Sequence, residues 1–343
     1  MKEALFWKSE AGAVRCGLCC RRCLIPEGGV GVCRVRQNKG GRLYSLVYGK
    51  ASSIGIDPIE KKPLFHFAPG SLNLSVSTVG CNFRCSFCCN YAISQEWEGI
   101  RGEDAPPEKL VAVALENGLH GMAYTYTEPT IFFEYAQDTA LLAKKKGLYN
   151  IFVTNGYTTP EAIRKASSFL DAAVIDLKSS LDPDFYRKQS MVPDVQPIYD
   201  AMMAYKENGV FFEVTDLIMP ESDIKRTSKV CRWIADNLGP DVPLHFIQFF
   251  PSYKVCTGRT DVSMLDKAYE AAKKEGLNYV YLGNVPGNVH ESTMCPSCGR
   301  VVIERFGSSL VSIGLKAGKC GCGQKIPLAG MKWSLRKQFP SNK

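Results

Sequence analysis

From about residue 72 to residue 282, short apolar or β-branched runs alternate with stretches in which apolar residues recur at helical spacing. The runs predict strands over 72–79, 121–127, 150–154, 172–177, 211–219, 244–250 and 278–282. The stretches between them predict helices over 107–117, 131–146, 160–169, 195–208, 222–237 and 263–275. Pro107 and Pro160 stand where a first helical turn tolerates proline. Six or seven such units predict an α/β fold with a parallel sheet and outer helices, a full or partial barrel for which we take the partial (β/α)6 form.

The pattern changes at both ends of this alternation and so predicts four regions. Residues 1–50 form a Cys-rich metal-binding lobe, 51–70 a connector, 71–287 the barrel, and 288–343 a second Cys-rich metal-binding module. In the connector, Asp57 to Phe67 carries two prolines and interleaved charges, which favours an extended segment. Its His66 is more typical of a hydrogen-bonded structural histidine than of a ligand.

Composition narrows the classes of function. The chain of 343 residues is 45% hydrophobic, as in an ordinary globular protein, and its net charge of +8 is scattered rather than gathered in runs. A solvated basic surface is the simpler interpretation, although nucleic acid stays open as a partner. No apolar run of about 18 residues and no signal-like N-terminus is present, so we expect no membrane span and a cytoplasmic location.

Fifteen cysteines are the outlier, and three groups hold most of them. In a reducing compartment, clustered cysteines indicate metal or redox chemistry more often than disulfides. The central group is Cys81, Cys85 and Cys88, spaced Cys-x3-Cys-x2-Cys directly after the first predicted barrel strand. Three thiolates on one loop suit a [4Fe-4S] cluster whose fourth iron binds a non-protein ligand. Structural zinc would require four closed ligands.

The two outer groups predict further metal sites. In the N-terminal lobe, four cysteines form the best ligand set and Cys20 is the spare; the spacing leaves zinc and a second iron–sulfur cluster both open. That set is Cys16, Cys19, Cys23 and Cys33. Near the C-terminus, two cysteine pairs bracket a β-rich stretch, which is typical of a zinc-ribbon or rubredoxin-like module holding zinc or iron. That set is Cys295, Cys298, Cys320 and Cys322, with Cys-x-Cys as its second pair.

The cluster loop, the strand–helix succession and several strand-end motifs resemble the pyruvate formate-lyase activating enzyme branch of the radical S-adenosylmethionine (SAM) superfamily. Both cysteine lobes, Asp57 to Phe67 and Thr125-Tyr126-Thr127-Glu128-Pro129 look closer still to the radical SAM enzyme of the AmmeMemoRadiSam system. The resemblance covers nearly the whole chain. It implies that SAM completes the cluster and is cleaved to methionine and a 5′-deoxyadenosyl radical, which abstracts hydrogen from a substrate.

The resemblance also implies cofactor-binding residues, whereas it makes no catalytic residue certain. Phe87 would lie near the adenine, and Thr127 and Glu128 would meet the methionyl ammonium. The other implied contacts, at the ends of the third and fourth strands, are Asn155, Asp176 and Lys178.

Some residues depart from the activating enzymes. Val153 replaces the aspartate of a monovalent-cation site, Phe250-Pro251-Ser252-Tyr253 lacks a histidine, and Cys89 stands where relatives carry Gln. The expected partners are an external low-potential electron donor and a substrate, which is a protein or peptide in preference to a small molecule or RNA. A non-catalytic iron–sulfur or zinc electron-transfer scaffold is the alternative from another class.

Overall fold

The computed structural model describes residues 1–334, and its centre is one curved eight-stranded sheet. The strand order is β16-β15-β14-β13-β12-β11-β9-β8, and all neighbours from β9 to β16 are parallel. The parallel strands are β9 (Leu72–Ser77), β11 (Gly121–Tyr124), β12 (Tyr149–Thr154), β13 (Ala172–Lys178), β14 (Phe211–Ile218), β15 (Leu244–Gln248) and β16 (Val280–Gly283). Because β8 and β16 are the two edges, the sheet forms a partial barrel. The expected α/β fold is confirmed.

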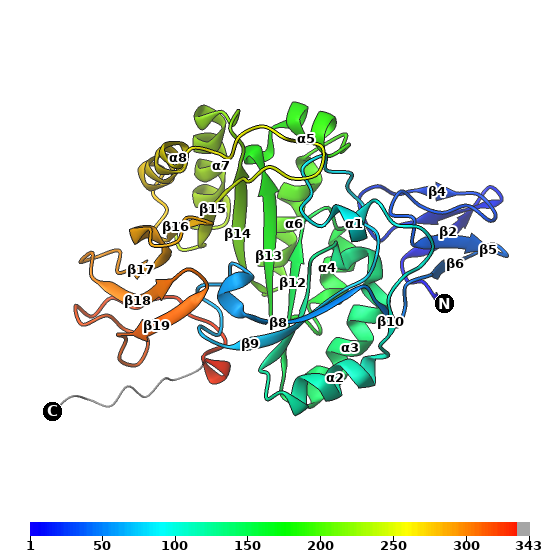
Figure 1. The fold of residues 1–343 in the computed structure, drawn as a ribbon, viewed down its shortest axis with the longest axis horizontal. Coiled ribbons are helices and arrows are strands. Elements are labelled where there is room, and N and C mark those ends of the chain that lie inside the picture. Colours follow the sequence, from blue (N-terminus) through cyan, green and yellow to red (C-terminus); the bar gives the residue numbers. More distant parts are fainter. Residues whose placement is uncertain (335–343) are drawn as a thin grey trace.

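Helices cover the outer face of this sheet (Figure 1). The six expected helices are α2 (Pro107–Glu116), α3 (Phe133–Lys145), α4 (Pro160–Ala166), α6 (Gln196–Glu207), α7 (Ile224–Asn237) and α8 (Val262–Lys274). Side-chain caps fix several of the starts: Thr159 accepts from the Ala162 amide, and Asp223 from the Lys225 amide. The periodicity did not indicate α1 (Tyr91–Ser94) or α5 (Pro183–Gln189), which are only one or two turns long.

Part of the expected connector belongs to the sheet. Strand β8 (Ser53–Pro58) pairs antiparallel with β9 and places Asp57 opposite Asn73. Asp57 there binds Lys62 Nζ at 2.7 Å, and both side chains are buried. The His66 ring is also buried and contacts the Pro327 carbonyl (2.9 Å) and the Tyr281 hydroxyl (2.6 Å), so its structural interpretation is confirmed.

The Cys-rich lobe lies at one end of the sheet and shares its core (Figure 1). Its two three-stranded sheets are β2-β3-β4 (Trp7–Glu10, Ala13–Cys16, Leu24–Ile25) and β1-β6-β5 (Lys2–Glu3, Arg42–Ser45, Arg36–Lys39). The short pair β7 (Lys50–Ala51) and β10 (Glu103–Asp104) borders the lobe. Arg36 and Glu134 of α3 form a buried ion pair at 2.9 Å, which fixes the lobe against the barrel.

The C-terminal module lies at the opposite end and has a small core of its own (Figure 1). Its antiparallel sheet consists of β17 (Thr293–Met294), β18 (Val301–Phe306) and β19 (Ser309–Ile313). Arg305 Nη2 donates to the Phe65 carbonyl at 2.6 Å and joins the module to the connector. The 3-10 helices are η1 (Ile59–Lys61), η2 (Pro129–Phe132), η3 (Ser179–Leu181), η4 (Val289–Glu291) and η5 (Met331–Trp333).

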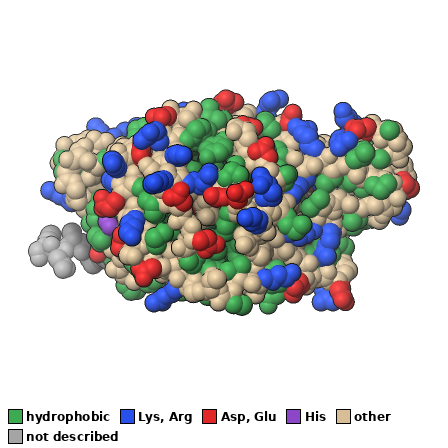
Figure 2. Space-filling view, turned by 90° about the horizontal axis from the view of Figure 1, so that it is seen from above, with side chains coloured by type: hydrophobic (Ala, Val, Ile, Leu, Met, Phe, Trp, Pro, Cys, Tyr) green, Lys and Arg blue, Asp and Glu red, His purple; other side chains and the backbone are tan. Residues whose placement is uncertain are grey.

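The face of the molecule drawn in Figure 2 matches the scattered charge pattern of the sequence. In Figure 2, basic and acidic side chains alternate across the face in view, without one continuous basic groove. None of the helices in residues 1–334 has both the length and the apolar character required to span a membrane.

Candidate cluster and cofactor site

The loop that carries Cys81, Cys85 and Cys88 follows β9 at the carboxyl edge of the parallel sheet. This is the edge where ligands bind in open and barrel-forming α/β sheets. Gly80 starts the loop with φ +98°, and a Cβ there would lie 2.8 Å from the Cys33 carbonyl oxygen. Only glycine therefore fits both the backbone conformation and the close approach of the N-terminal lobe.

Neighbouring segments hold the loop by its backbone. Gln95 Nε2 donates to the Cys85 carbonyl at 2.7 Å, and the Ser86 amide donates to the Gln189 carbonyl at 2.8 Å. From the N-terminal lobe, Arg21 Nε donates to the Asn82 carbonyl at 2.9 Å. With its backbone fixed from both sides, the loop holds its three thiols in place before any ligand binds.

The three thiols fit an iron–sulfur cluster. Burial raises the pKa of Cys85 to about 11, and burial and then Glu128 raise that of Cys81 above its ordinary value. Buried thiols of this kind become thiolates only when a bound metal supplies positive charge. Cys85 and Cys88 each have a hydroxyl 3.3 Å from the sulfur, from Ser190 and Ser94. Hydrogen bonds of this type tune cluster potentials.

Glu128 follows β11 and joins the ends of two strands. It is 2% exposed, and its Oε1 accepts from the Thr130 amide, the Thr130 hydroxyl and the Thr154 hydroxyl at 2.6–3.0 Å. Its Oε2 accepts from the Asn155 amide at 2.8 Å. Protein donors therefore hold this carboxylate rigidly, and its contact with a SAM ammonium stays a prediction.

Asn155 and Thr127 tie the same edge to the cluster loop. Asn155 Nδ2 donates to Asn82 Oδ1 at 2.7 Å, and Thr127 Oγ1 donates to the Thr78 carbonyl at 2.9 Å. The structure thus brings Thr127, Glu128 and Asn155 together beside the cysteines, as their strand-end positions predicted. Asn82 was not among the residues singled out from the sequence.

Lys178 ends β13 and pairs with Asp176. Burial alone lowers the pKa of Lys178, but Asp176 and the nearby Cys85 and Cys88 together raise it. The Lys178 ammonium is therefore near enough to both thiols to be stabilised by their negative charge. Asp176 also accepts from Thr215 Oγ1 at 2.9 Å. The Phe87 ring is 5% exposed and packs on Phe185 at 5.3 Å, so its contact with adenine also stays a prediction.

The sequence reasoning also missed a strained segment after β13. Ser179, Ser180 and Leu181 all have left-handed backbone, with φ of 44°, 50° and 53°. Asp216, buried in β14, supports it by accepting from the Ser180 amide (2.9 Å) and hydroxyl (2.7 Å). Burial raises the pKa of Asp216 to about 6. The polar residues Glu213, Thr215 and Asp216 within a strand that is apolar elsewhere were the available signal. Strained backbone of this kind clusters at functional sites.

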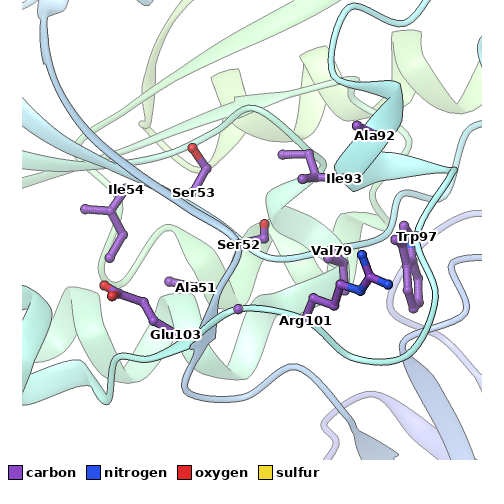
Figure 3. A pocket seen from close by; sticks show the side chains of 11 residues that line it. Ala51, Ser52, Ser53, Ile54, Val79, Ala92, Ile93, Trp97, Arg101 and Glu103 are labelled. Atoms are coloured by element: carbon purple, nitrogen blue, oxygen red, sulfur yellow. The ribbon is translucent and has the colours of Figure 1, made fainter.

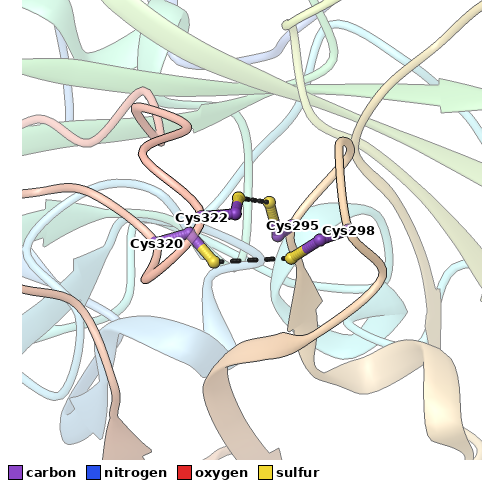
Figure 4. Close-up of side chains that lie close together, drawn as sticks. All are labelled: Cys295, Cys298, Cys320 and Cys322. Atoms are coloured by element: carbon purple, nitrogen blue, oxygen red, sulfur yellow. Dashed lines mark hydrogen bonds between the residues drawn. The ribbon is translucent and has the colours of Figure 1, made fainter.

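The C-terminal cysteines converge at the spacing of a single ion (Figure 4). Cys295 and Cys322 sulfurs are 3.5 Å apart, Cys298 and Cys320 sulfurs are 3.6 Å apart, and all four lie within 4.8 Å of one another. Tetrahedral zinc with Zn–S bonds of about 2.3 Å places its sulfurs about 3.8 Å apart. The four C-terminal cysteines therefore converge as expected, and their spacing fits a single tetrahedral metal ion.

A pocket of about 540 Å³ lies between β8, α1 and the segment that leads to β10 (Figure 3). Ser52, Val79, Ile93, Trp97 and Arg101 line it. None of the cysteines or strand-end residues described above lines it, whereas Val79 directly precedes Gly80 at the start of the cluster loop.

Known proteins resemble this chain in sequence and in fold. A family model described as the radical SAM superfamily matches residues 75–233. An uncharacterized protein of Methanocaldococcus jannaschii, MJ0808, is 40% identical over 336 residues, which are 96% of this chain and 99% of that protein.

Among solved structures, Streptococcus suis SuiB bound to S-adenosylmethionine is similar with a TM-score of 0.50 and 13% identity, over 66% of this chain and 53% of SuiB. This chain thus matches about half of SuiB, and at that identity the likeness is one of fold. A domain of a pyruvate-formate lyase-activating enzyme from Bacteroides vulgatus aligns with a TM-score of 0.42 and 15% identity, over 48% of this chain and 99% of that domain.

Proposed function

Because the chain belongs to the radical SAM superfamily, we propose that it cleaves SAM to methionine and a 5′-deoxyadenosyl radical, which abstracts hydrogen from a protein or peptide. A [4Fe-4S] cluster on Cys81, Cys85 and Cys88 supplies the electron, because such centres reach potentials low enough to reduce a sulfonium. The observation that carries the proposal is the loop of three thiols with Glu128, Asn155 and Lys178 around it. A closed zinc or electron-carrier site needs no such surroundings.

The residues around the loop would bind and orient SAM. Lys178 is placed to pair with a carboxylate, and Thr127 and Glu128 to receive an ammonium, through charge-assisted hydrogen bonds. Phe87, Asn155 and Asp176 complete the proposed contacts. By fixing SAM and excluding water, these side chains direct the radical to one substrate.

The unclosed sheet favours a large substrate. Its edges, β8 and β16, are not paired with each other, and the connector bridges them where His66 contacts Tyr281 of β16. A peptide segment would therefore approach the cluster loop from the carboxyl edge of the sheet. A small molecule or RNA is the second candidate, and trapping deuterium from labelled substrates in 5′-deoxyadenosine distinguishes them. The electron donor would be an external low-potential reductant of the cytoplasm. For the C-terminal cysteines we propose zinc.

The test is anaerobic reconstitution followed by SAM and dithionite, with 5′-deoxyadenosine measured by mass spectrometry. We expect product from the full-length protein and from Cys256→Ala, which alters an exposed lone thiol, but none from Cys85→Ala. Protein with a complete cluster that yields no 5′-deoxyadenosine would favour the electron-transfer scaffold.

A further inference from the structure

The four N-terminal cysteines line a single cavity. Cys16, Cys19, Cys23 and Cys33 all contribute to its wall, whereas Cys20 does not. The Cys20 amide instead donates to the Tyr157 carbonyl at 3.1 Å. Much of the remaining wall is apolar, from Leu18, Ile25 and Ile131. The cavity thus combines four soft ligands with a wall that excludes water, which suits a redox centre.

The spacing of these sulfurs differs from that of the zinc-like site. Within residues 1–334, only the C-terminal cysteines gather three or more ligand atoms within 4.8 Å of one another. The N-terminal four are more open, and so are Cys81, Cys85 and Cys88 on the cluster loop. A single ion draws its thiolates together, whereas the iron atoms of a cubane stand at separate corners and hold them farther apart. By this internal comparison, the N-terminal set resembles the cluster loop.

Three residues that line this cavity each carry a buried N–H donor with no hydrogen-bond partner within residues 1–334. The donors are Arg36 Nε, Arg21 Nη2 and Asn82 Nδ2. Arg36 is 2% exposed and uses its other nitrogens on Glu134 and the Leu5 carbonyl. Asn82 is fully buried. Unpaired buried N–H groups are rare and costly, so their presence on three residues of one cavity wall favours an anionic acceptor there.

The cavity also adjoins the SAM cluster loop. Asn82 is part of its wall, and Asn82 Oδ1 lies 3.8 Å from Cys81 Sγ. The Cys33 carbonyl approaches Gly80 so closely that a Cβ there would be 2.8 Å away. Asn82 therefore lies between the four N-terminal cysteines and the cluster loop, and contacts both sites.

We propose that Cys16, Cys19, Cys23 and Cys33 bind a second iron–sulfur cluster, not zinc, and that this cluster is the entry point for electrons. One electron from an external low-potential donor reduces the N-terminal cluster. The same electron then passes by way of Asn82 to the cluster on Cys81, Cys85 and Cys88. The binding of the second cluster is independent of the proposed function; only the electron-entry role depends on it.

Metal analysis of the anaerobically reconstituted full-length protein tests the cluster. We expect about eight irons per chain, from two four-iron clusters, with zinc confined to the C-terminal site. The triple variant Cys81→Ala/Cys85→Ala/Cys88→Ala should keep about four irons and a reduced electron paramagnetic resonance signal that does not respond to SAM. Cys19→Ser should lose the irons of the N-terminal cluster and keep those of the cluster on Cys81, Cys85 and Cys88. The matched control Cys20→Ser should lose no iron.

A triple variant without iron but with a second zinc would overturn the proposal. Should that variant fold poorly, electron paramagnetic resonance of the reduced wild-type protein gives the same answer. Two signals, of which SAM shifts only one, support the second cluster. A single signal that SAM shifts refutes it. Because these measurements need no turnover, they stand even if 5′-deoxyadenosine is never formed.

The electron-entry role has its own test. With a reduced flavodoxin as donor, 5′-deoxyadenosine formation should fall at least tenfold in Cys19→Ser relative to Cys20→Ser, while the SAM cluster keeps its iron and its SAM-dependent signal. Equal rates in the two variants would refute the entry role. Loss of the SAM-dependent signal in Cys19→Ser would refute it as well, since the lobe would then act on the loop structurally.

Discussion

Replacing Gly80 by alanine tests whether the N-terminal lobe holds the cluster loop. The new Cβ would meet the Cys33 carbonyl oxygen and Val35 Cγ1 at 2.8 Å each, and Ile131 Cδ1 at 3.3 Å. The positive φ of +98° adds about 1–2 kcal/mol for any residue with a Cβ. Overpacking against a carbonyl that cannot easily move adds about 1–3 kcal/mol. The Gly80→Ala variant should therefore be destabilised by about 2–5 kcal/mol in all.

Gly147→Ala is the matched control. Gly147 has φ +81°, and no atom lies within 4 Å of the position its Cβ would take. The Gly147→Ala variant should therefore be destabilised only by its positive φ, which costs about 1–2 kcal/mol. Denaturant unfolding of both variants, followed by circular dichroism, measures the difference, and iron content with 5′-deoxyadenosine yield measures the effect on the loop.

Of the two variants, we expect only Gly80→Ala to lose iron and to form less 5′-deoxyadenosine. If the two variants are equally destabilised, or if Gly80→Ala keeps full iron and product, the close packing of lobe and loop does not support the cluster, and the reasoning is refuted.

Three further predictions follow from buried charges and from the zinc-like site. The stability of Asp216→Asn relative to the wild type should rise by about 1–2 kcal/mol between pH 5 and pH 8, because burial raises the pKa of Asp216 to about 6 and the wild-type protein therefore loses stability as pH rises from about 4 to 6; unfolding curves at both pH values check this. Glu128→Gln should lower the free energy of unfolding by about 1–3 kcal/mol, because its NH2 group would face N–H or O–H groups that now donate hydrogen bonds to the carboxylate. Glu161→Gln, at an exposed position, is the control in the same denaturation assay. Cys298→Ser should remove about one zinc per chain by metal analysis, unlike Cys256→Ser; a variant with unchanged zinc would contradict the closed four-thiolate site.

The sequence alone determined the elements and the chemistry of the central loop. Strand and helix periodicity depends on local burial, so the seven parallel strands and six longer helices were predictable, although α1 and α5 were too short to show a period. The spacing of Cys81, Cys85 and Cys88 specified three thiols on one loop. Strand-end positions likewise placed Glu128, Asn155 and Lys178 on one edge, since parallel strands end together.

Only the tertiary structure decided how distant segments share a site. Spacing left zinc and a second iron–sulfur cluster open for the N-terminal set, and zinc and iron open for the C-terminal set, because the convergence of the sulfurs depends on how turns far apart in the chain fold together. Asn82 joins the N-terminal cavity to the cluster loop, and Asp216 supports Ser180, through contacts across 36 residues or more of chain. Periodicity and motif spacing describe neighbours along the chain, whereas these contacts arise when the lobe and the strands pack together.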